Sequence, residues 1–249
     1  MSKITNILTG LILAAATTTI NATIIADNYV GADDKGVGDV VGNPAKYDIL
    51  DMDVSMLAGN MLSVSINTNF TAYNGTNPST TVDGNGIVYG DLFLSSSWTP
   101  FGSSPYASDD ASNGTIWTHG FSLDDNTLNG GTGSLFSLNA GDNDANALLS
   151  DEVMNPGSSF RSGQEVEVDR ASDITLLGSS NWTVSGSNVN FLIDLTGTGL
   201  ENSNTIALHW TMSCANDVIE GQYTVPEPAL VGLLAMGLIG IGISKRKKI

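Results

Sequence analysis

The stretch Ile206-Ala-Leu-His-Trp-Thr-Met-Ser-Cys214 decides the fold class of this chain. Apolar side chains occupy every second position, at Ile206, Leu208, Trp210, Met212 and Cys214. Because successive side chains of a strand point to opposite faces, this period of two predicts a β-strand. We therefore expect these five side chains to face a core.

The same alternation recurs along the middle of the chain. It is clearest at residues 62–66 and 189–195. Further candidate strands are 52–56, 87–94, 116–123, 165–168, 174–177 and 182–184. Clusters of Gly, Asn, Asp and Ser, such as 129–133, lie between them and predict turns, because these residues favour turn conformations. Many short strands without an internal repeat predict one all-β domain over residues 23–223, an antiparallel β-sandwich or jelly roll.

The charge of this middle region excludes one class of partner. The 249-residue chain has 26 acidic and 9 basic residues and a net charge of −17. Between residues 23 and 225 the only bases are Lys35, Lys46, Arg161 and Arg170. Affinity for nucleic acid comes largely from Lys and Arg that neutralise phosphates, so we expect no nucleic-acid binding. The single cysteine, Cys214, permits no intrachain disulfide.

Residues 1–22 are typical of a secretory signal peptide. Lys3 is their only charge, an apolar stretch covers 4–16, and a small polar run ends at Ala22. The apolar stretch is too short to anchor the chain in a bilayer. We expect a signal helix, export by the Sec machinery and a mature chain that begins at Thr23, with cleavage after Ala16 as the alternative.

The C-terminal residues 224–249 combine three elements in order: Pro226-Glu227-Pro228, an uncharged apolar run over 229–243, and a basic tail. The tail consists of Lys245, Arg246, Lys247 and Lys248. At ~1.5 Å per residue the apolar run forms roughly 22 Å of helix, which can cross a bilayer that thins around it while lysines snorkel. The sequence predicts a single transmembrane helix, with the basic tail in the cytoplasm and the bulk of the chain outside.

This C-terminal arrangement resembles the PEP-CTERM sorting signal of Gram-negative bacteria that make extracellular polysaccharide. The resemblance implies that an exosortase-type membrane protease processes the chain near Pro226, Glu227 and Pro228, and that the helix anchors it in the inner membrane until then. The tail is richer in Lys than is common in the family, but its charge and position are kept. Residues 89–95, 98–100 and 214–221 also resemble the globular part of some PEP-CTERM proteins, which implies no catalytic residues.

Few residues of this chain suit catalysis. Nucleophilic catalysis needs a base beside the nucleophile, and the only histidines are His119 and His209. Strand alternation places His209 and Cys214 on opposite faces, so they cannot pair along that strand. We expect both histidines at the surface. With 26 carboxyl groups, some pair always falls at the spacing of a glycosidase, so such a pair carries little information. We predict no catalytic residue.

Two sets of residues suit ligand binding. Asp142-Asn-Asp144-Ala-Asn146 offers the oxygen ligands that calcium prefers, but Ala147 stands where an EF-hand has its glycine. A looser calcium loop and a solvated turn both stay open, and segment 33–39 and pair 124–125 are weaker candidates. Trp98, in a Trp-Thr-Pro-Phe loop, and the nearby Tyr106 are the best candidates to stack on sugar rings.

Together these features predict a protein of the cell surface or extracellular matrix of a Gram-negative bacterium. We expect a non-catalytic β-domain that associates with exopolysaccharide or contributes to biofilm. The alternatives are a secreted carbohydrate-active enzyme and an adhesin that stays tethered to the membrane.

Overall fold

The computed structural model describes residues 22–32, 38–72, 86–127, 129–139, 141–154 and 159–226. Strands and short helices alternate along them, in the order β1 (Thr23–Ala26), α1 (Pro44–Tyr47), β2 (Ile49–Leu57), β3 (Met61–Thr68), η1 (Asn69–Ala72), β4 (Leu92–Ser95), β5 (His119–Leu123), β6 (Gly130–Leu138), β7 (Ala147–Leu149), α2 (Ser150–Val153), β8 (Glu165–Val168), β9 (Ile174–Ser185), β10 (Asn188–Asp194), η2 (Leu200–Asn202), β11 (Thr205–Thr211) and β12 (Val218–Thr224). Within these ranges no helix has the length and apolar character needed to cross a membrane.

Ten of the strands join in one antiparallel sheet, in the order β1-β2-β3-β10-β9-β6-β5-β4-β11-β12. The neighbours β2 and β3 are connected by a tight hairpin. Three residues, 58–60, connect the paired Leu57 and Met61, and the last two of them, Gly59 and Asn60, have positive φ of 78° and 61°, as tight hairpin loops require. The turn between β9 and β10 likewise uses Gly186, with φ of 61°. Turn chemistry thus sets the register of the two hairpins that build one half of the sheet.

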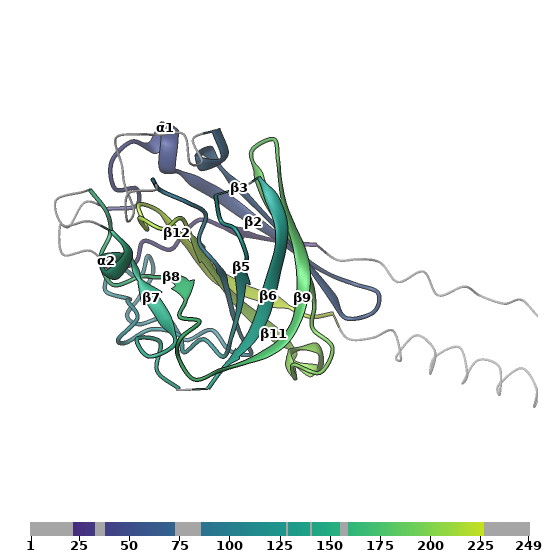
Figure 1. Cartoon of the computed structure of the whole chain (residues 1–249). Helices are drawn as coiled ribbons and strands as arrows, with labels where there is room; N and C mark the ends of the chain where they lie inside the picture. The colour runs from purple at the N-terminus through teal and green to yellow at the C-terminus, as the bar shows by residue number, and fades with distance from the viewer. Residues whose placement is uncertain are drawn as a thin grey trace, which may run out of the picture. The chain divides into compact units, whose positions relative to one another are not determined.

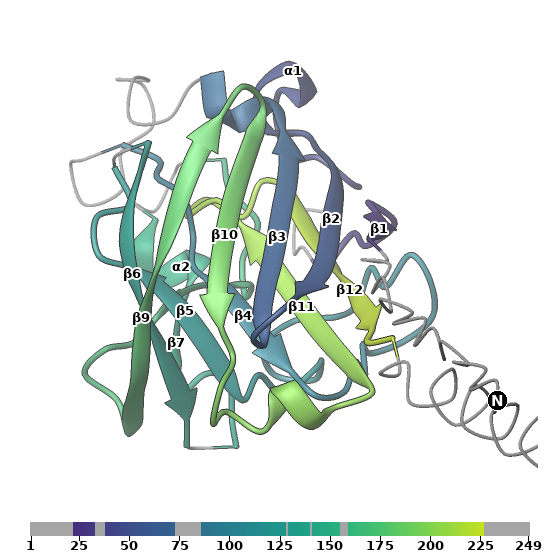
Figure 2. The same cartoon turned by 90° about the vertical axis from the view of Figure 1, so that its right-hand side faces the viewer.

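The sheet curves so strongly that its halves face each other across one core. Figure 2 shows β9, β10, β3 and β2 in front of β5, β4, β11 and β12. Aromatic contacts join the two halves: the rings of Phe121 on β5 and Phe191 on β10 meet edge to face, 6.0 Å apart. The edge strands β1 and β12 also approach each other. A Cβ added to Gly221 on β12 would lie only 2.6 Å from Cγ2 of Ile25 on β1.

The core between the two halves contains the five side chains that strand alternation predicts. Ile206, Leu208, Trp210, Met212 and Cys214 are all completely buried. Apolar area removed from water stabilises a fold by about 25 cal/mol per Å², so this run of large side chains contributes strongly.

A smaller layer covers the outer face of part of the sheet. β7 and β8 form a two-stranded sheet of their own, and Figure 1 shows this pair with α2 on one side of the large sheet. Ala147 and Val168 from this pair pack with Phe93 and Ala207 of the large sheet and with Trp117. Because of this cover, β11 is buried on both faces and not only on its core side.

The predicted all-β antiparallel domain is confirmed, with three differences in detail. The expected two faces of a sandwich are two halves of a single ten-stranded sheet. The cluster 129–133, expected as a turn, largely belongs to β6, where Gly133 is needed because a Cβ there would lie 2.5 Å from the Phe121 ring. The two histidines are buried and not at the surface, since His119 is 8% exposed and His209 is 0% exposed.

Candidate functional site

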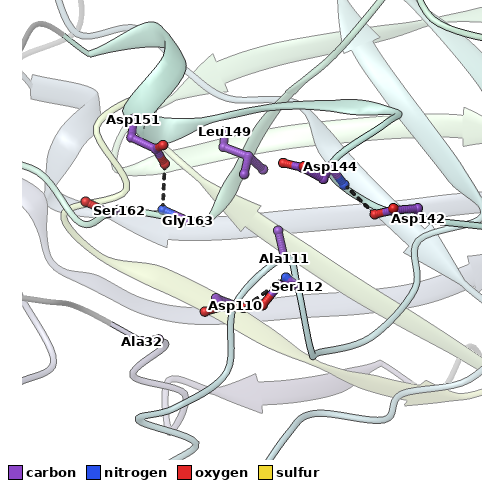
Figure 3. A pocket seen from close by; sticks show the side chains of 10 residues that line it. All are labelled: Ala32, Asp110, Ala111, Ser112, Asp142, Asp144, Leu149, Asp151, Ser162 and Gly163. Atoms are coloured by element: carbon purple, nitrogen blue, oxygen red, sulfur yellow. Dashed lines mark hydrogen bonds between the residues drawn. The ribbon is translucent and has the colours of Figure 1, made fainter.

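An open cavity of about 470 Å³ is lined by four aspartates (Figure 3). Asp142 and Asp144 come from the loop before β7, Asp151 from α2, and Asp110 from the loop before β5. Three of the four carboxylates accept hydrogen bonds from the backbone: Asp142 from the N–H of Asp144 at 3.1 Å, Asp151 from that of Gly163 at 2.9 Å, and Asp110 from that of Ser112 at 2.9 Å. The cavity therefore collects negative charge on short, well-anchored loops.

The predicted calcium residues divide between two roles. Asp142 and Asp144 are exposed and line this cavity together. Asn146 is buried, and its side-chain amide donates to the carbonyl oxygen of Asp142 at 2.9 Å. The amide thus braces the loop that carries both aspartates.

The second predicted pair, Trp98 and Tyr106, is brought together by the loop between β4 and β5. Their rings meet edge to face with centroids 5.4 Å apart, and Tyr106 stacks on Tyr29 at 6.0 Å. Both side chains are partly buried, whereas Phe101 of the same loop is 51% exposed. The loop forms an aromatic surface, which we call the aromatic loop (residues 96–108).

A hydrogen bond anchors the aromatic loop to a buried polar network. The indole N–H of Trp98 donates to Oε1 of Glu220 at 2.6 Å, and the hydroxyl of Thr115 donates to the same oxygen at 3.2 Å. The other carboxylate oxygen of Glu220 lies 3.2 Å from Nδ1 of His209. Nε2 of His209 donates to the carbonyl oxygen of Glu165 at 2.8 Å. All these groups lie beneath Trp98.

Burial and neighbouring charges shift the pKa values of the titratable groups in and around this network. Burial lowers the pKa of His209, but the hydrogen bond to Glu220 and the negative charge of Glu165 outweigh it, and the net pKa is raised. Both ring nitrogens face acceptors, which fits a protonated imidazolium. Burial raises the pKa of Glu165 to about 7, and burial followed by the charge of Glu220 raises that of Asp109 to about 6.

Residue-by-residue reasoning missed this network. The alternation of side chains along β11 points His209 away from the main core. A position at the surface was therefore expected. Its burial depends on β7 and β8, and nothing within 205–211 indicates that another strand pair covers that face. The acidic residues Glu165 and Glu220 belong to β8 and β12, and only the fold brings them to His209.

The sorting signal falls mostly beyond the described residues. Pro226 is the last of these. Outside them lie Glu227, Pro228, the predicted helix over 229–243 and the basic residues Lys245, Arg246, Lys247 and Lys248, together with residues 1–21 of the predicted signal peptide over 1–22. A family model described as the PEP-CTERM protein-sorting motif matches residues 224–247. The chain carries a PEP-CTERM sorting motif. The match confirms the resemblance of the C-terminal sequence to this family.

The PEP-CTERM motif marks an exported protein that is sorted to the cell surface and processed by exosortase, a membrane protein. The motif covers only the end of the chain and assigns no activity to the β-domain. No curated protein and no solved structure matches the chain.

Proposed function

We propose that this PEP-CTERM protein is a non-catalytic component of the cell surface or matrix that binds exopolysaccharide through its aromatic loop. The observation that carries the proposal is the exposed ring of Phe101 in the loop that also holds the Trp98–Tyr106 pair, on a chain exported to the surface. Aromatic rings bury large areas at low entropic cost and suit the apolar faces of sugar rings.

The anchoring of the loop supports binding rather than turnover. The hydrogen bond from Trp98 to Glu220 is short and partly buried, so it holds the loop in one conformation before any ligand arrives. Pre-organised surfaces bind with less loss of conformational entropy. The carboxylate of Glu220 already contacts Trp98, Thr115 and His209, which leaves little of it to act on a substrate.

A binding measurement on Phe101→Ala tests this proposal. The full-length chain in mild detergent is titrated with the exopolysaccharide of its own organism, and binding is followed by affinity electrophoresis. Loss of one stacked ring, worth about 0.5–1.5 kcal/mol, weakens binding about 2–10-fold. Leu176→Ala is the matched control, because Leu176 is 60% exposed on β9. Equal binding by both variants would remove the aromatic loop from the proposal.

A carbohydrate-active enzyme is the second candidate, favoured by the gathering of Asp109, Glu165, Glu220 and His209. Strongly shifted pKa values cluster at catalytic sites. Enzymatic activity would appear as progressive depolymerisation of the polysaccharide by the wild type and its loss in Glu165→Gln. Binding without any new reducing ends supports the non-catalytic proposal.

Processing separates the matrix component from a permanently tethered adhesin. We propose export by the Sec machinery, transient anchoring in the inner membrane of a Gram-negative bacterium, and removal of the C-terminal helix. Mass spectrometry of the protein recovered from the cell surface determines whether the C-terminal helix has been removed. A retained segment from Lys245 to Ile249 would instead support the tethered adhesin.

The calcium loop at Asp142, Asp144 and Asn146 stays a prediction. The acidic cavity supports it, since two of the three residues face the same space as Asp110 and Asp151. The variant Asp144→Asn removes one of these carboxylates.

A further inference from the structure

Three carboxylates from distant parts of the chain lie close together near the two edge strands of the sheet, β1 and β12. Asp27 directly follows β1, Asp217 directly precedes β12, and Asp39 belongs to the loop that leads to α1. One carboxylate oxygen from each residue lies within 4.8 Å of the others. Among the described residues this is the one such trio of His, Cys, Asp or Glu ligand atoms. We call it the Asp27–Asp39–Asp217 cluster.

The carboxylate of Asp27 is poorly satisfied by the protein. Both of its oxygens are shielded from solvent and accept no well-formed hydrogen bond, and the backbone N–H of Tyr29 and the charge of Arg161 only partly offset the burial that raises its pKa. Buried charged groups are otherwise paired or coordinated to a metal, because desolvation of an isolated carboxylate costs several kcal/mol. Asp217, in contrast, is fully buried and accepts from the backbone N–H groups of Ile49 at 2.6 Å and Val218 at 3.0 Å. The poorly satisfied oxygens of Asp27 therefore lie beside a carboxylate held rigidly in place.

The surrounding charges leave the cluster negative. The nearby base is Arg161, whose guanidinium donates to the carbonyl oxygens of Gly31 at 3.0 Å, of Gly38 at 2.8 Å and of Asp39. With all three carboxylates ionised, one guanidinium would leave two negative charges in excess, and Asp48 adds to the repulsion on Asp27 and Asp39. A single divalent cation supplies the missing charge.

We infer that Asp27, Asp39 and Asp217 form a divalent-cation site, with calcium as the fitting ion. Calcium binds oxygen ligands at about 2.3–2.6 Å, so ligands on opposite sides of the ion are about 4.6–5.2 Å apart, and three oxygens that all lie within 4.8 Å of one another can share one ion. Calcium also accepts irregular sets of ligands, whereas magnesium demands near-ideal octahedral geometry. The exposed position of Asp39 leaves the ion a route from solvent.

An ion bound here has a structural role, because it connects three separate segments of the chain. It ties the end of β1 to the start of β12, the two edge strands of the sheet, where β1 has only four residues to hold it in place. It also fixes the loop of Asp39, which Arg161 already holds through its carbonyl oxygen. The cation site is distinct from the acidic cavity and from the aromatic loop, and the inference does not depend on polysaccharide binding.

Thermal unfolding of the full-length chain in mild detergent, with CaCl₂ or with EDTA, tests the inference. For a site with Kd on the order of 10⁻⁴ M, a 100-fold excess of Ca²⁺ raises Tm by about 5–10 °C. Asp39→Asn loses this Ca²⁺-dependent rise and keeps the carbonyl oxygen that binds Arg161. Asp27→Asn also loses the rise, and at about pH 9 in EDTA its Tm is higher than that of the wild type, because the amide removes a carboxylate that is ionised at this pH with no cation to balance it. Asp53→Asn, the matched control at an exposed carboxylate of β2, keeps the rise.

The opposite effects of Asp27→Asn in EDTA and in Ca²⁺ distinguish a cation site from a purely structural carboxylate. A lower Tm of this variant in EDTA would show that the protein already satisfies the carboxylate, and the inference would fail. It would fail equally if Ca²⁺ left the wild-type Tm unchanged, if the rise survived in both cluster variants, or if Asp53→Asn abolished it.

Discussion

Replacement of Gly221 by alanine places a methyl group between the two edge strands of the sheet. The added Cβ would lie 2.6 Å from Cγ2 of Ile25, and 3.6 Å and 3.7 Å from its Cδ1 and Cβ. Ordinary contacts between such carbons are about 3.5–4.0 Å, so β1 and β12 must separate by roughly 1 Å. Because Ile25 is buried, the side chain cannot simply swing into solvent.

The expected cost follows from this overlap. Overpacking of this kind destabilises a protein by about 1–3 kcal/mol, which lowers the Tm of a domain of this size by roughly 2–12 °C. Ile25→Ala removes the opposing atoms and alone costs about 2–5 kcal/mol, since it leaves a cavity. In the double variant the alanine at position 221 meets only the Cβ of residue 25, at the ordinary contact distance of 3.7 Å, so its cost should fall by about 0.5–3 kcal/mol.

Urea unfolding followed by circular dichroism measures all four proteins of this cycle. Gly178→Ala on β9 is the matched control, because no atom lies within 4 Å of its added Cβ. We expect that control to leave the free energy of unfolding unchanged or to raise it by about 0.4–1 kcal/mol. Strict additivity of Gly221→Ala and Ile25→Ala, or equal stability of the two glycine variants, would refute the close approach of β1 and β12.

Two further predictions concern buried carboxylates. Asp91 accepts hydrogen bonds from the backbone N–H groups of Leu123 and Val168, both at 2.8 Å. The variant Asp91→Asn places an amide N–H₂ opposite one of these donors, so one hydrogen bond is lost. We expect urea titrations to show a free energy of unfolding that is lower by about 1–3 kcal/mol. Unchanged stability would show that these bonds do not join β8 to the large sheet. Burial and then repulsion among the acids raise the pKa of Asp27 and Asp217, so the folded state binds protons more tightly and Tm in EDTA should fall as pH rises above about 4. Asp27→Asn should flatten this pH dependence, and an equal slope in both proteins would contradict the assigned cause.

Local patterns predicted the strands whose side chains alternate cleanly. Residues 62–66, 189–195 and 206–214 were recognisable because one face is apolar and the other polar. β6 was harder, because its glycines resemble a turn in sequence. Gly133 is there because the Phe121 ring packs against its backbone, and that neighbour comes from another strand. The sequence pattern of one segment does not indicate such a contact with another strand.

The candidate sites were predictable only in part. Composition drew attention to Asp142, Asp144, Trp98 and Tyr106, and the structure places each pair together. Their companions come from elsewhere in the chain: Asp151 completes the cavity, and Glu220 anchors the aromatic loop. The distances between such residues along the sequence gave no sign that they meet.

The sequence by itself determined the all-β class, the acidic character and the cell-surface address. Those properties depend on short-range periodicity, on composition and on a motif whose elements are contiguous, and each is complete within one segment of the chain. Only the tertiary structure decided that ten strands form one curved sheet, that His209 is buried, and that Asp27, Asp39 and Asp217 share a site. These features depend on which distant strands become neighbours, and that outcome follows from packing of the whole core rather than from any one stretch.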